Sequence, residues 1–117
     1  EAGEYSLTFL EGRCVLAAQK PPLFKGDGSA RRRIVDLPDL PPRLLRFAEE
    51  VLAAFAATFA PGSISRTRLD LFDQGGIPIL CELETVDPNT NIRLVAEQRG
   101  EGAAQAIFSV YAQVISL

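Results

Sequence analysis

The order of apolar and polar residues predicts a β-hairpin at the start of the chain. From Glu4 to Leu10, apolar and polar side chains alternate, which is the period of a half-buried strand. Glu11 and Gly12 then supply a turn, and residues 13–20 return with small and apolar side chains that end at Lys20. We therefore expect two antiparallel strands joined by a tight connection.

Prolines and glycines interrupt this pattern in the next stretch. Pro21 and Pro22 stop strand pairing because proline has no N–H to donate, and residues 25–29 are rich in glycine and charge, as in a loop. Residues 31–35 predict a short strand. The proline-punctuated residues 36–42 then lead to a helix, since the last proline occupies a position where helices commonly begin.

Two later segments have the spacing of amphipathic helices. Between Arg43 and Ala60, apolar residues recur at intervals of three and four, with many alanines between them. Pro61 and Gly62 are typical of a helix end. A second helix is expected from Gly102 to Ser116, where apolar residues gather on one face. We expect it to pack on the sheet.

A second hairpin is predicted between these helices. Residues 65–72 alternate, residues 73–76 form a turn, and residues 77–86 alternate again. Because the strands are grouped and the helices segregated, the pattern predicts an α+β fold with a largely antiparallel sheet packed by two amphipathic helices. The length suits one domain over residues 1–117.

One face of the second hairpin is rich in charge. Arg68 and Asp70 point the same way from the first strand, and Glu82 and Glu84 share a face of the returning strand. The two pairs emerge on one surface only if the loop has an odd length or a strand contains a bulge, which the glycine pair in the turn permits. A plain two-residue turn would instead place Asp70 opposite the glutamates.

Three carboxylates on one patch raise one another's pKa unless a positive charge is nearby. Arg68 offers one such charge. A hard divalent cation offers another, and Mg²⁺ is usual where carboxylates share an ion with nucleotide phosphates. Taken alone, the pattern is also typical of the solvated side of a sheet, so both interpretations stay open.

The order of these residues resembles the carboxyl-terminal hairpin of ATP-grasp enzymes. In that family an Arg-x-Asp strand, a turn, and an apolar run ending in Glu-x-Asn or Glu-x-Glu bring metal ligands to the phosphates of ATP. The resemblance implies that Asp70, Glu82 and Glu84 hold Mg²⁺. It also implies that Arg68 is catalytic, contacting the transferring phosphate or a developing oxyanion. Glu84 stands where many members have asparagine.

Three further positions are candidates for cofactor binding. Glu4 resembles the family glutamate that accepts hydrogen bonds from the ribose hydroxyls, and Lys20 resembles the phosphate-contacting lysine. Arg33 belongs to the basic cluster at residues 31–33. That cluster either contacts a phosphate or substrate carboxylate, or forms a solvated strand edge.

The resemblance covers nearly the whole chain and looks nearest to the glutathione-synthetase-like branch of carboxylate ligases. It implies ATP and Mg²⁺ as cofactors and a carboxylate substrate that reacts through an acyl phosphate. It also implies that the hinge and lid of the module lie upstream, so that this carboxyl-terminal portion is insufficient alone. The rival interpretation is a non-catalytic binding or assembly module that pairs with another chain, including a homodimer.

Composition and charge narrow the remaining classes of function. The formal net charge is -3, and the arginine cluster does not extend into a basic stripe, which ranks nucleic-acid binding last. No apolar run approaches the roughly 18 to 20 residues that cross a bilayer. Cys14 and Cys81 lack neighbouring cysteine or histidine, which argues against zinc. ATP and Mg²⁺ imply a cytoplasmic setting.

Overall fold

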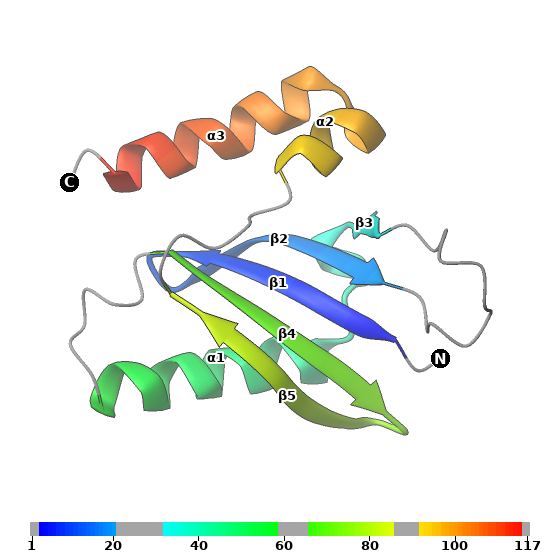
Figure 1. The fold of residues 1–117 in the computed structure, drawn as a ribbon, viewed down its shortest axis with the longest axis vertical. Helices are drawn as coiled ribbons and strands as arrows, with labels where there is room; N and C mark the ends of the chain where they lie inside the picture. Colours follow the sequence, from blue (N-terminus) through cyan, green and yellow to red (C-terminus); the bar gives the residue numbers. More distant parts are fainter. Residues whose placement is uncertain (1–2, 21–31, 59–65, 86–91, 116–117) are drawn as a thin grey trace.

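The computed structural model describes residues 3–20, 32–58, 66–85 and 92–115. Within these residues, five strands form one antiparallel sheet in the order β3-β2-β1-β4-β5, so the two hairpins lie side by side (Figure 1). The strands are β1 (Glu4–Leu10), β2 (Arg13–Lys20), β3 (Arg33–Val35), β4 (Arg66–Gln74) and β5 (Ile77–Glu84). The expected α+β class and antiparallel sheet are confirmed.

Helices cover both faces of the sheet. The helices are α1 (Pro42–Thr58), α2 (Ile92–Arg99) and α3 (Glu101–Ile115), with a short 3-10 helix, η2 (Leu37–Asp39), before α1. Figure 1 shows α1 on one side of the sheet and α2 with α3 on the other. Helix α1 begins at Pro42, as its prolines predict. The expected loop at residues 25–29, Arg31 and the helix-ending Pro61–Gly62 lie outside the described residues.

The larger core lies between the sheet and α1. Alternate side chains of the central strands β1 and β4, including Leu7, Phe9, Leu69 and Leu71, are fully buried there against Leu44 of α1. Each such side chain contributes about 1.5 to 3 kcal/mol through the water it releases. This core fixes which residues of β4 face away from α1, and Arg68 and Asp70 are among them.

The opposite face of the sheet is divided into an apolar and a polar part. Over β2 and β3, Leu16, Ala18 and Ile34 form a second buried cluster with Val95 of α2 and Ala104 of α3. Over β1, β4 and β5, the same face carries hydroxyl and charged side chains. The helices on this side are therefore anchored at the β3 end of the sheet, away from β5.

Helix α2 was not predicted from the sequence, and its contacts explain why it forms. The Gln98 side chain accepts a hydrogen bond from the Ile34 N–H (2.8 Å) and donates one to the Arg32 carbonyl (2.8 Å), so it pairs with the free edge of β3 as a strand would. Arg99 adds bonds to the Ile34 carbonyl (3.2 Å) and the Asp36 carboxylate (3.4 Å). These long-range contacts, together with the buried side chain of Val95, stabilise this short helix.

The second hairpin contains a bulge that sets its register. Gly75 and Gly76 form a two-residue turn with φ of 61° and 88°, values that favour glycine. Beside the turn Leu71 pairs with Leu80, whereas one step further Asp70 pairs with Glu82. Cys81 lies between these two pairs without a partner in β4, so it is the extra residue of a β-bulge in β5.

The bulge brings Arg68 and Asp70 to the same side of the sheet as Glu82 and Glu84, which is one of the two registers that the strand pattern allowed. The turn itself is shorter than the four residues expected, because β4 continues to Gln74.

The hairpin is also fastened to α1. Asp73, on the α1 side of β4, forms an ion pair with Arg43 and accepts a hydrogen bond from the Gly76 N–H (3.2 Å). These contacts of Asp73 hold β5 in place from the face of the sheet opposite Arg68 and Asp70.

Candidate functional site

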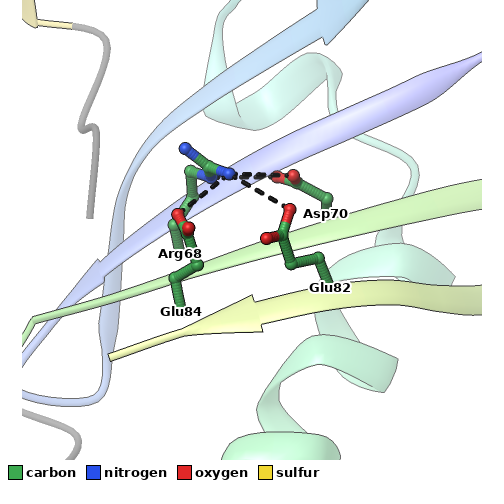
Figure 2. Close-up of polar contacts among 4 residues, drawn as sticks. All are labelled: Arg68, Asp70, Glu82 and Glu84. Atoms are coloured by element: carbon green, nitrogen blue, oxygen red, sulfur yellow. Dashed lines mark hydrogen bonds and ion pairs between the residues drawn. The ribbon is translucent and has the colours of Figure 1, made fainter. Parts of the chain in front are cut away.

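Four charged side chains from β4 and β5 meet on the face of the sheet away from α1. Figure 2 shows the guanidinium of Arg68 between the carboxylates of Asp70, Glu82 and Glu84, called here the acidic cluster. One nitrogen, Nη2 of Arg68, lies 3.1 Å from Asp70 Oδ2, 3.5 Å from Glu82 Oε2 and 3.0 Å from Glu84 Oε2. The convergence predicted from the strand pattern is therefore present.

The Arg68–Asp70 contact is a buried two-point ion pair. Besides the Nη2 contact, Arg68 Nε donates to Asp70 Oδ1 at 3.1 Å, so two parallel hydrogen bonds join the side chains. The side chains are only 9% and 4% exposed. A two-point bond of this kind fixes orientation as well as distance, so Asp70 holds Arg68 in one position above β4.

The two glutamates are held less firmly. Their side chains are 52% (Glu82) and 37% (Glu84) exposed, and each contacts Nη2 of Arg68. The pKa of Glu82 is raised, first by the Glu84 carboxylate, then by desolvation and by Asp70, while Arg68 lowers it. One guanidinium therefore does not offset the repulsion among the carboxylates of the acidic cluster.

This raised pKa gives stability a pH dependence of definite sign. Folded Glu82 binds its proton more tightly than the unfolded group, whose pKa is 4.5. Without added metal, the free energy of unfolding should therefore fall as pH rises from 4.5 through the raised pKa, and then level off. Urea unfolding of the wild type and Glu82→Gln between about pH 4 and about pH 8 measures this. Parallel profiles for the two proteins would contradict the prediction.

The acidic cluster offers ligands of the right chemistry for Mg²⁺, which prefers carboxylate and phosphate oxygens. As they lie, however, the carboxylates surround the guanidinium of Arg68. Within the described ranges no three aspartate, glutamate, cysteine or histidine side chains are grouped to hold one ion. The donor chemistry fits Mg²⁺, but Glu82 and Glu84, whose side chains are partly exposed, would have to turn away from Arg68 before the three carboxylates could share an ion.

The structure brings Glu4 and Lys20 together on the face that carries the acidic cluster. Glu4 pairs with Lys20 across β1 and β2, and two residues further along β1, Ser6 pairs with Asp70. Residues directly opposite in antiparallel strands share a face. Thr8, the partner of Arg68, is four residues from Glu4, or about 13 Å along the strand.

Arg33 is not brought to this surface. It pairs with Gln19 in β2 and donates a hydrogen bond to the Gln19 side chain (2.5 Å), which in turn donates to the Tyr5 hydroxyl (3.3 Å). Tyr5 belongs to the core against α1. Arg33 therefore lies on the opposite face of the sheet from the acidic cluster.

Three further residues lie beside the acidic cluster and were not expected there from the sequence. Ser6 and Thr8 have buried hydroxyls without a hydrogen-bond partner in the described part of the chain, and they flank Asp70 and Arg68. Cys81, the bulge residue, is exposed, and its pKa is raised by desolvation and by the Glu4 and Asp70 carboxylates. The alternation of β1 places Ser6 and Thr8 on one face of the strand, which is the one sequence signal for them. Nothing in the sequence indicates the position of the bulge at Cys81.

Among solved structures, the chain is similar to a D-alanine–D-alanine ligase from Bacillus anthracis, crystallised in complex with ATP. The TM-score is 0.56 at 15% sequence identity, and the match covers 99% of this chain and 36% of the ligase chain. The chain shares its fold with an ATP-grasp ligase. This confirms the fold implied by the resemblance of residues 68–84, and the chain spans about a third of the ligase's length.

Other comparisons add no closer relationship. No family model and no curated protein matches the sequence. The likeness to the ATP-grasp ligase therefore concerns the fold, and the roles of individual residues rest on the geometry described above. None of the helices in the described ranges is long and apolar enough to span a membrane.

Proposed function

We propose that this chain is the carboxyl-terminal half of an ATP-grasp module and supplies the metal and phosphate side of its ATP site. The parent activity is an ATP-dependent ligation in which a carboxylate is activated as an acyl phosphate. The observation that carries the proposal is the convergence of the acidic cluster and Arg68 on one face of the sheet. A solved ligase with ATP has the same fold over this chain.

The nucleotide would lie along β1 and β4, between the Glu4 end and the Arg68 end of the face. Glu4 would accept hydrogen bonds from the ribose hydroxyls, and Lys20 beside it would contact a phosphate. Asp70, Glu82 and Glu84 would hold Mg²⁺ near the terminal phosphates. The distance of about 13 Å between the two ends suits an extended nucleotide. Arg33 takes no part in this proposal, because it lies on the other face.

Each group has a role that matches its chemistry. A substrate carboxylate oxygen attacks the γ-phosphorus of ATP, the bond from that phosphorus to the β,γ-bridging oxygen breaks, and ADP leaves. Arg68 stabilises the negative charge on the equatorial oxygens of the transferring group. Bound Mg²⁺ would neutralise charge on the phosphates. An amine then attacks the acyl carbon, inorganic phosphate leaves, and the amine loses a proton.

An ATP-grasp site closes between two halves, so the proposal requires the amino-terminal hinge and lid as a partner. The isolated chain should bind Mg·ATP weakly and not hydrolyse it. Calorimetry with ATP and MgCl₂ tests this requirement, and tight binding with hydrolysis would show that the chain is sufficient alone. Its ATP and Mg²⁺ requirement assigns the activity to the cytoplasm.

Cys81 provides a built-in reporter for the proposed nucleotide position. Its thiol is exposed and lies near Glu4 and Asp70, so nucleotide bound along β1 and β4 should cover it. In the full-length protein, saturating Mg·ATP should slow alkylation of Cys81 by iodoacetamide at least about tenfold, since access governs the reaction of an exposed thiol. Peptide mass spectrometry against time measures both rates.

Cys14 is the internal control for this experiment. It is partly buried in the α1 core, and burial raises its pKa to about 11, so it should react slowly with or without nucleotide. Equal protection of both thiols would indicate a general tightening of the fold. An unchanged alkylation rate for Cys81 at saturating Mg·ATP would count against the proposed position.

A second candidate is a non-catalytic assembly module, and one observation favours it. Apolar side chains are exposed near the free edge strand β5, namely Phe72, Ile77, Ile79 and Leu80. Strand edges with exposed apolar residues are common association surfaces. If this function holds, light scattering should detect a homodimer or another complex that forms without ATP, and Mg·ATP should leave Cys81 reactive.

A further inference from the structure

Arg68 has a position that its proposed role in phosphate contact does not require. A residue that only awaited a phosphate could point into solvent, whereas the Arg68 side chain is 9% exposed and makes ion pairs with three carboxylates. One atom of Arg68, Nη2, contacts a carboxylate oxygen of each of Asp70, Glu82 and Glu84. The guanidinium thus occupies the position in which a shared cation would contact all three.

Arg68 contacts one buried carboxylate and two carboxylates that are partly exposed. Asp70 is buried and bound through both Nε and Nη2 at 3.1 Å. Glu82 and Glu84 are partly exposed, and both contact Nη2. Rotation of these two partly exposed side chains would break their contacts with Arg68.

The negative charge of the three carboxylates exceeds the positive charge of Arg68, so a second cation would be attracted to them. Three carboxylates and one guanidinium carry a formal charge of about -2 when all are ionised, which is the charge that one divalent ion balances. An ion and Arg68 cannot both lie at the centre of the acidic cluster, because two positive centres at that separation repel. One must leave the glutamates when the other takes them.

We infer that Arg68 is a resident counter-cation that exchanges Glu82 and Glu84 with the incoming divalent ion. Before the ion binds, Arg68 holds the two glutamates together on the surface. When the ion binds, Glu82 and Glu84 turn to it, and the Nη2 side of Arg68 is released toward the phosphates. Asp70 keeps Arg68 above β4 throughout by the hydrogen bond from Nε to its Oδ1, while its Oδ2 joins the two glutamates as a ligand of the ion. This inference rests on the proposed function, since it assumes that the acidic cluster receives a metal ion.

The exchange predicts that Arg68 competes with the metal ion. Arg68→Gln should bind Mn²⁺ without nucleotide at least about fivefold more tightly than the wild type, because a positive charge about 4 Å from the ion is removed. The same variant should bind Mg·ATP more weakly, since its phosphate contact is lost. A purely structural role for Arg68 would weaken both affinities together.

Electron paramagnetic resonance of free Mn²⁺ measures the first affinity in the 117-residue chain, and calorimetry of the full-length protein measures the second. Arg46→Gln is the matched control, because it removes the same charge from an exposed position on α1, across the sheet. Its Mn²⁺ affinity should match the wild type within about twofold. Equal or weaker Mn²⁺ binding by Arg68→Gln, with normal binding by the wild type, would overturn the exchange alone.

Removing Arg68 also lowers stability, so a second measurement uses the wild-type chain. In a ¹⁵N NMR titration with MgCl₂, the Nη resonances of Arg68 should shift as Glu82 and Glu84 leave, while the Nε resonance, bonded to Asp70, stays in place. An Nη signal that does not move while Mg²⁺ saturates the protein would overturn the inference. Absence of any Mg²⁺ or Mn²⁺ binding to the wild type, with or without ATP, would overturn the proposed function as well.

Discussion

Glu82→Gln in a full-length protein that contains this chain is expected to abolish ATP turnover without loss of thermal stability. The proposed transfer depends on fixed charges around the phosphates, and removing one such group commonly costs at least about a hundredfold in rate. The fold should tolerate the change, because the Glu82 side chain is 52% exposed and its carboxylate is repelled by its neighbours. Neutralising it relieves that repulsion, so melting should be unchanged or slightly higher near neutral pH.

The measurements are steady-state ADP release and thermal unfolding of the same preparation. Glu50→Gln is the matched control, since Glu50 is an exposed glutamate of α1 on the other side of the sheet. It should retain wild-type turnover. Asp70→Asn is less informative, because Asp70 is buried against Arg68 and its substitution should lower stability as well as turnover. Wild-type turnover in Glu82→Gln would remove the acidic cluster from the mechanism.

The elements of the fold could be predicted wherever a residue's neighbours in sequence decide its environment. The alternation around Tyr5 and the helical spacing around Leu44 predict a strand and a helix, and both segments form, although β1 is buried on both faces rather than on one. Helix α2 could not be found in this way. It depends on Gln98, whose partners Arg32 and Ile34 lie more than sixty residues earlier.

In the candidate site too, features set by neighbouring residues in the sequence could be predicted, and features set by long-range contacts could not. Strand period placed Arg68 with Asp70 and Glu82 with Glu84, because alternate residues of a strand share a face. The pattern left two registers open, and the bulge at Cys81, which chose between them, has no signature in the sequence. Nor did the pattern show that Arg68 would lie among the carboxylates, since side-chain direction follows the local balance of charge.

Among Arg68 and the three residues of the acidic cluster, substitution of Arg68 by an uncharged residue should lower the free energy of unfolding most. Arg68→Met keeps the length of the side chain but leaves Asp70, 4% exposed, without its buried partner, and leaves the carboxylates to repel one another. Breaking a buried ion pair from one side typically costs about 3 to 5 kcal/mol, because a desolvated charge remains uncompensated. We expect urea unfolding without added metal to show a loss at the lower end of this range, since Glu82 and Glu84 reach solvent.

The double variant Arg68→Met with Asp70→Leu identifies the cause. It replaces both members of the buried pair with apolar side chains, an exchange that is often close to neutral, so most of the lost stability should return. Arg46→Met, at an exposed position of α1, should change stability by less than about 0.5 kcal/mol. If the Asp70→Leu change instead adds a further loss, the cost would come from packing around β4, and the buried ion pair would not be what stabilises this face.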